Sequence, residues 1–309
     1  MIPAVQWPEG KRFAFSVFDD PDGCSKESRR VYHFLADLGF RTTMAVWPIG
    51  PLRDANSRGE TCADPDYRAY AVDLQLRGFE IGYHNAAPHT CTRQEIVDSF
   101  ERFREYFGAP PVAAANHYNV DALYWGSARL HSGWRRALYE LASLRQQRNH
   151  YSGHVEGSPY FWGDLCHQYI RYFRNFVYRE INTLKACPIQ PYSDPERPYV
   201  RAWFCSAEGT DCRSYVQTIS DANLDRLEEE GGMCIMYTHF GKGFVENGNL
   251  HAEFNRLTTR LSKKNGWFAP VTQLLDHLHS IHGTVVIPPR ELAHLESKWL
   301  MSKLFHGTS

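Results

Sequence analysis

Four expected strand ends carry side chains that could bind a metal or move a proton. In chain order they are Asp19 with Asp20, His84, Asn116 with His117, and His239. The carboxyl ends of parallel strands in a (β/α) barrel meet at one mouth, so we expect these groups to converge there. Of two neighbouring carboxylates, one can then bind a metal while the other accepts a proton from water.

A second histidine, His89, lies in the same loop as His84. Neutral imidazole together with carboxylate is a ligand set that suits Zn²⁺, and Co²⁺, Ni²⁺ or Mn²⁺ can use it too. The pattern therefore predicts one divalent transition metal at the barrel mouth.

These side chains are placed by alternating strands and helices. Apolar runs predict strands at residues 12–18, 42–49, 79–83, 112–115, 199–204 and 233–237, with strand-like segments at 267–271 and 284–287. Helical spacing and capping residues predict helices at residues 26–38, 65–77, 92–108, 251–264 and 272–282. This alternation implies parallel pairing with right-handed crossovers, and hence one distorted, incomplete (β/α) barrel.

The middle of the chain breaks this rhythm, and we expect a helical insertion at about residues 122–190. Tyr169, Phe173, Phe176 and Val177 would share one face of an amphipathic helix packed on the core. The arginines between these aromatic residues leave two other interpretations open, a nucleic-acid groove or a wall for an anionic sugar.

Composition narrows the classes of function. The 309 residues carry 34 Lys and Arg against 35 Asp and Glu, a net charge of -1, which argues against a general nucleic-acid binder. The eight cysteines form no CxxC pair, so we expect reduced, mostly buried thiols. With no apolar run of membrane length and no leader pattern, we expect a single cytoplasmic domain over residues 1–309 with no membrane span.

The motifs resemble those of the polysaccharide deacetylases with a NodB homology domain. FSVFDD is similar to the family's first strand ending in two aspartates, and Gly78 to His84 resembles its second motif, G-x-E-I-G-x-H. The strand CIMYTH resembles the last motif, and WFAPVTQLLDHL resembles the closing helix. The resemblance runs from about residue 12 to residue 278.

The resemblance implies a role for each matched residue. Asp19 would be the general base, Asp20, His84 and His89 would bind the metal, and His239 would be the general acid. The implied activity is metal-dependent hydrolysis of a non-peptide C–N bond, with an N-acylated sugar or glycan precursor as substrate. Hydrolysis of small cyclic amides or ureides and glycan binding without turnover remain as alternatives.

The sequence departs from the family pattern at two places. His89 follows His84 by five residues instead of four, and Asn85 replaces the usual Ser or Thr. The family's Arg-x-Pro motif is absent, and Asn116, His117 and Tyr118 follow the fourth strand instead. Asn116, His117 and Tyr118 are therefore possible metal ligands or substrate contacts, and His117 is the alternative to His89 as the third ligand. The general base would either lack an arginine partner or receive one from the insertion.

Overall fold

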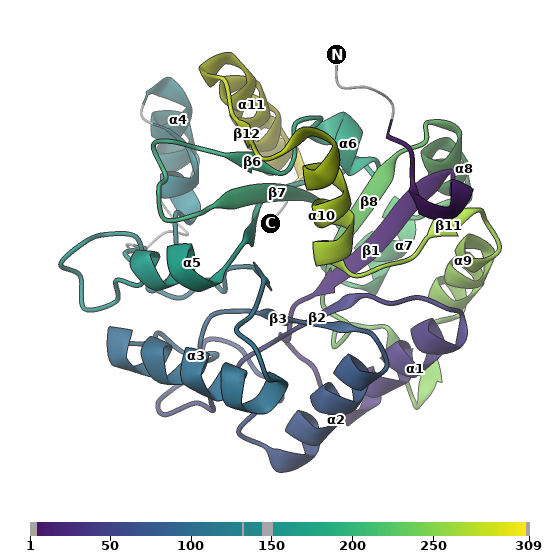
Figure 1. Cartoon of the computed structure of the whole chain (residues 1–309), viewed down its shortest axis with the longest axis horizontal. Coiled ribbons are helices and arrows are strands. Elements are labelled where there is room, and N and C mark those ends of the chain that lie inside the picture. Colours follow the sequence, from purple (N-terminus) through teal and green to yellow (C-terminus); the bar gives the residue numbers. More distant parts are fainter. Residues whose placement is uncertain (1–4, 132, 144–150, 307–309) are drawn as a thin grey trace.

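Seven parallel strands form a closed ring in the computed structural model (Figure 1), which describes residues 5–131, 133–143 and 151–306. The ring runs in the order β1-β2-β3-β4-β5-β7-β8 and closes where β8 pairs with β1. Its strands are β1 (Phe13–Asp19), β2 (Thr43–Val46), β3 (Glu80–Tyr83), β4 (Ala113–Ala114), β5 (Tyr172–Tyr178), β7 (Ala202–Ala207) and β8 (Met233–Thr238). The expected (β/α) barrel is present, with one strand fewer than the usual eight.

Short strands extend the sheet outside this ring. They are β6 (Tyr192–Ser193), β11 (Gly266–Trp267) and β12 (Val285–Val286), and β9 (Val245–Glu246) with β10 (Asn249–Leu250) forms a separate hairpin. The strand-like segments expected at 267–271 and 284–287 are thus edge additions, not barrel strands.

Most of the helices lie around the outside of the ring, as the alternation in the sequence predicts, and one lies across its amino-terminal end. The helices are α1 (Arg29–Asp37), α2 (Pro65–Leu76), α3 (Arg93–Phe107), α4 (Trp134–Ser143), α5 (Gly163–Tyr169), α6 (Thr183–Ala186), α7 (Cys212–Thr218), α8 (Asp221–Glu229), α9 (Ala252–Ser262), α10 (Val271–His282) and α11 (Pro289–His306). Short 3₁₀ turns occupy Pro8–Gly10, Lys26–Ser28 and Gly126–Arg129. None of the helices in the described part of the chain is long and apolar enough to cross a membrane.

Helix α10 closes the amino-terminal end of the barrel. Its first residue, Val271, donates its N–H to the hydroxyl of Thr43 at the start of β2. Thr272 hydrogen bonds to Glu80 at the start of β3, and Tyr172 at the start of β5 donates to Asp276. The opposite, carboxyl-terminal end is left to carry the site.

The helical insertion expected at residues 122–190 is only partly present. It contains the 3₁₀ turn and helices α4, α5 and α6, but β5 lies within it as a central strand of the ring. The prediction of an amphipathic helix through Phe173, Phe176 and Val177 is wrong, because all seven residues of β5 are buried in strand conformation. Residue 132 and residues 144–150 of this segment lie outside the described residues.

All eight cysteines are free thiols, and seven of them are buried while Cys24 is partly exposed. This agrees with the expectation of reduced, mostly buried cysteines.

Candidate metal centre and active site

Side-chain alternation along β1 decides which aspartate enters the barrel. Successive residues of a strand point to opposite faces of the sheet. Phe13, Phe15 and Val17 belong to the core between the ring and the helices, whereas Ala14 and Phe18 belong to the second core inside the ring. Counting onward, Asp19 faces outward and Asp20 faces inward.

The carboxylate of Asp19 is held between β1 and its neighbours by two hydrogen bonds. It accepts one from the hydroxyl of Tyr32 on α1 at 2.5 Å and one from the backbone N–H of Phe240 at 2.7 Å. Burial raises the pKa of Asp19 well above its usual value, against the lowering effect of both hydrogen bonds. Each oxygen of Asp19 thus serves a buried structural contact.

Asp20 forms a buried, bidentate ion pair with Arg174 of β5. Arg174 donates to the two oxygens at 3.0 and 2.5 Å, and the two side chains are 4% and 2% exposed. The guanidinium also lies over the ring of Tyr237, 4.2 Å from its centroid. Arg174 was not among the expected site residues, although it follows inward-facing Tyr172 by two positions and a strand interpretation would have found it.

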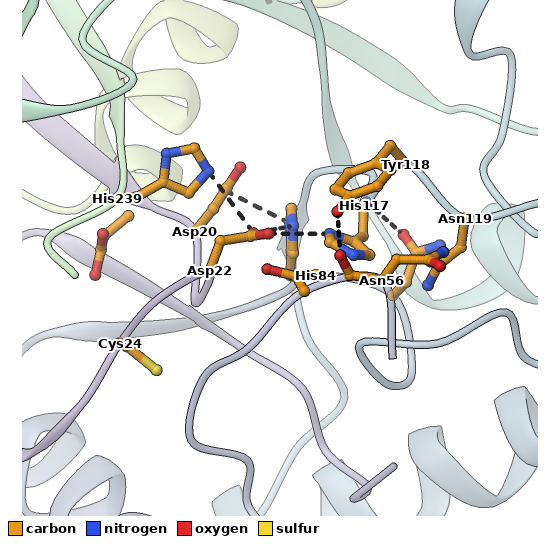
Figure 2. A network of polar contacts seen from close by, with 12 residues as sticks. Asp20, Asp22, Cys24, Asn56, His84, His117, Tyr118, Asn119 and His239 are labelled. Carbon is orange, nitrogen blue, oxygen red and sulfur yellow. Dashed lines mark hydrogen bonds and ion pairs between the residues drawn. The ribbon is translucent and has the colours of Figure 1, made fainter. Parts of the chain in front are cut away.

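The side chain of Asp22, two residues beyond Asp20, contacts two histidines that follow β3 and β4 and lie on one side of it (Figure 2). Its Oδ2 is 3.3 Å from Nε2 of His84, and its Oδ1 is 3.5 Å from Nδ1 of His117. Among the described residues, Asp22, His84 and His117 are one of two groups whose possible ligand atoms all lie within 4.8 Å of one another.

The electrostatics of this trio favour a cation. Burial raises the pKa of Asp22, but hydrogen bonds from His117 and His84 and their charge outweigh it, so that pKa lies well below its usual value. Burial lowers the pKa of His117, which favours neutral imidazole. One buried nitrogen on each ring, Nδ1 of His84 and Nε2 of His117, has no hydrogen-bond partner within the described structure. Two imidazole nitrogens and a carboxylate are a ligand set that fits a divalent transition metal.

His89 lies in a different place from the one expected. Its Nε2 is 3.7 Å from both Cys91 Sγ and Glu95 Oε1, and these three residues form the second group. Glu95 is already paired with Arg53 at 2.5 Å and caps α3 through the N–H of Thr92. The structure therefore brings His84 together with His117 and Asp22, and does not bring His89 into that group.

His239 enters the mouth from the end of β8, on the other side of Asp22 (Figure 2). Its Nδ1 donates to the backbone carbonyl of Thr210 at 2.6 Å, which leaves Nε2 directed toward Asp22, 3.7 Å from Oδ2. Burial lowers the pKa of His239 to about 4. A ring fixed at one nitrogen presents the other in a defined position for proton transfer.

The two other candidates differ in their surroundings. Asn116 faces away from the mouth, because its side chain accepts from the N–H of Leu123 and donates to the carbonyl of the same residue, both at 2.8 Å. The ring of Tyr118 lies against that of His117, tilted by 46° with 4.4 Å between centroids; its hydroxyl donates to the carbonyl of Asn56, and the side chain is 43% exposed. Of the two, only Tyr118 is open to a substrate.

Solved structures with the same fold are similar to this chain along most of its length. One is a putative polysaccharide deacetylase from Mycobacterium smegmatis, with a TM-score of 0.53, 13% identity and coverage of 93% of this chain and 97% of that one. A second is a probable polysaccharide deacetylase from Pseudomonas aeruginosa PAO1, with a TM-score of 0.52, 13% identity and coverage of 91% and 95%. A third is PuuE allantoinase, with a TM-score of 0.52, 12% identity and coverage of 92% and 95%.

No protein-family model matches the chain, and no curated protein matches it either. The structural likeness confirms the fold expected from the motifs, and it fits a divergent chain of the NodB type.

Proposed function

We propose that this protein is a metal-dependent hydrolase of a non-peptide amide bond, and that it deacylates an N-acylated sugar or glycan precursor. The observation that carries the proposal is one arrangement at the carboxyl end of the barrel. Asp22, His84 and His117 form a compact ligand set, with the Asp20–Arg174 pair and the Nε2 of His239 beside it.

Asp22, His84 and His117 would hold the metal, with zinc as the first choice from the ligand types and Co²⁺, Ni²⁺ or Mn²⁺ as substitutes. A bound divalent metal polarises the amide carbonyl and makes a water molecule acidic enough to attack at neutral pH. This assignment replaces Asp20 by Asp22 and His89 by His117 relative to the roles that the motif resemblance implies.

Asp20 takes the role of general base in place of Asp19. It is the inward-facing member of the pair, and its Oδ1 lies 3.5 Å from Nδ1 of His84, next to the ligand set. The bidentate contact with Arg174 fixes the orientation of the carboxylate. Asp20 would accept the proton that water loses when its oxygen bonds to the carbonyl carbon.

His239 takes the role of general acid. The Thr210 carbonyl holds one proton on Nδ1, so Nε2 is the atom that would pass a proton to the departing nitrogen. Because burial lowers the pKa of His239 to about 4, Nε2 would take up that proton during the reaction, and its source is the proton that the attacking water releases to Asp20. Breaking the C–N bond and protonating the nitrogen gives an amine and a carboxylic acid, which balances the amide and the water consumed.

Cyclic amides or ureides are a second candidate substrate class, because the allantoinase matches this chain as well as the two deacetylases do. The two classes differ in the bond presented to the same groups, which is exocyclic in an N-acylated sugar and part of the ring in a cyclic amide.

The test is release of products by zinc-loaded protein from two substrate sets, N-acetylated sugars and their nucleotide- and lipid-linked forms, and allantoin with related cyclic amides. We expect turnover in one set, abolished by a chelator and restored by zinc. Asp20→Asn is the inactive comparison, and His89→Ala is the control that should retain activity. Stoichiometric zinc with no turnover of any substrate would contradict hydrolysis of these two substrate classes. Protein without stoichiometric zinc and without turnover would favour glycan binding instead.

A further inference from the structure

Asn85 connects the two histidines of the candidate metal centre. It directly follows His84, and its backbone has a φ of 56°, in the left-handed region that asparagine tolerates better than most residues. Its Oδ1 accepts a hydrogen bond from the backbone N–H of His117 at 3.1 Å. The position of His117 is thereby tied to the residue beside His84.

Asp121 fixes Asn85 from behind. Asn85 Nδ2 donates to Asp121 Oδ2 at 2.8 Å, and the side chains are 1% and 0% exposed. The other oxygen of Asp121 accepts from the N–H of Cys91 at 3.1 Å, and its backbone carbonyl accepts from the indole of Trp162 at 2.6 Å. Asp121 therefore anchors both ends of the loop from Asn85 to Cys91, although it does not belong to the metal-ligand group.

The same network holds His89 away from the centre. Asn119 donates to the backbone carbonyls of Ala87 and His89, at 3.2 and 2.7 Å, so the middle of the loop is fixed as well. With the loop attached at Asn85, Ala87, His89 and Cys91, the ring of His89 is directed toward Glu95.

We infer that Asn85 and Asp121 are positioning residues that select His117, and not His89, as the partner of His84 in metal binding. The inference rests on the proposed function for the identity of the site. Asp121 acts through Asn85, whose side-chain amide donates to the Asp121 carboxylate and accepts from the backbone N–H of His117. Loss of a hydrogen-bonding partner behind metal ligands typically lowers metal affinity about 10- to 100-fold.

A reciprocal exchange tests this inference directly. Asn85→Asp alone brings two carboxylates face to face at the 2.8 Å contact, and Asp121→Asn alone gives up one of the two acceptor oxygens. In the double variant N85D/D121N the donor and the acceptor change places. Position 121 then donates to position 85 and still accepts from Cys91, while position 85 still accepts from His117, so all three contacts can form.

We expect each single variant to bind Zn²⁺ about 10- to 100-fold more weakly in competition with a chromophoric chelator, and the double variant to recover most of that loss. The absorption spectrum of the Co²⁺-loaded protein should change in the single variants and return in the double variant. Glu80→Gln is the matched control, since Glu80 is hydrogen bonded to Thr43 and Thr272 at the opposite end of the strand that leads to His84. This control should bind Zn²⁺ like the wild type.

Wild-type affinity and spectrum in both single variants would overturn the inference, and so would a double variant no better than the weaker single one. Hydrogen exchange at backbone amides of the metal-free protein distinguishes failure of this inference from failure of the proposed function. If wild-type protein binds no zinc, the proposed function fails. Faster exchange at the His117 N–H in Asp121→Asn would then still support the positioning role, and unchanged exchange would refute it.

Discussion

The Asp20–Arg174 pair should be worth far more to stability than an exposed pair close to it in the chain. Its side chains are 2% and 4% exposed, and both oxygens of Asp20 accept from the guanidinium. Removing one partner of a buried ion pair leaves an uncompensated charge and costs about 3–5 kcal/mol. Arg174→Met, which keeps the length of the side chain and removes its charge, should therefore lower the free energy of unfolding by about that amount.

The neighbouring Arg171 supplies the matched control. It pairs with Asp276 at 2.7 Å, but these side chains are 50% and 43% exposed. Exposed pairs contribute about 0–1 kcal/mol, so Arg171→Met should change the free energy of unfolding by no more than that.

The double variant Arg174→Met with Asp20→Asn identifies the source of the loss. Neutralising Asp20 removes the uncompensated charge, so most of the 3–5 kcal/mol should return. Urea unfolding of metal-free protein is the assay, because a bound metal would add its own stabilisation. A loss below about 1 kcal/mol in Arg174→Met, or no recovery in the double variant, would refute the assignment of this pair as buried and mutually dependent.

Two further predictions concern proton transfer and acid stability. Asp20→Asn and His239→Ala should each lower turnover about 10²- to 10⁴-fold and leave zinc content unchanged, because neither residue is a proposed ligand; parallel loss of zinc would contradict the assignment. Burial raises the pKa of Asp121 from 3.8 to about 6, so its contribution to stability is full below pH 3.8 and is lost as the pH rises to about 6, by roughly 3 kcal/mol. Unfolding measured at pH 4 and pH 6.5 should show that this decline disappears in Asp121→Asn, and an identical slope in the two proteins would exclude Asp121 as its source.

Most of the barrel could be predicted from the sequence, because β1, β2, β7 and β8 are nearly continuous apolar runs. β5 was missed for a physical reason. Like β1 it is buried along its whole length, but Arg174 and Asn175 interrupt its apolar run, and its aromatic spacing also fits a helix. Reading this segment as a strand would also have placed Arg174 on the inward face.

Part of the candidate site could be predicted from the sequence. Alternation along β1 already separates outward Asp19 from inward Asp20, and the same count directs His117 inward after Ala113 and Ala115. Asp22 lies beyond the end of its strand, where no periodic pattern indicates direction. The position of His89 depends on contacts with Asn119 and Asp121, about 30 residues away in sequence, which local spacing cannot supply.

The proposed function depends on one metal bound by Asp22, His84 and His117. Elemental analysis and zinc X-ray absorption spectroscopy of wild-type protein, Asp22→Ala, His117→Ala and His89→Ala test it most directly. We predict about one zinc per chain with two histidine nitrogens and oxygen ligands in the wild type and in His89→Ala, and loss of that zinc in Asp22→Ala and His117→Ala. Full zinc in His117→Ala together with its loss in His89→Ala would contradict the account.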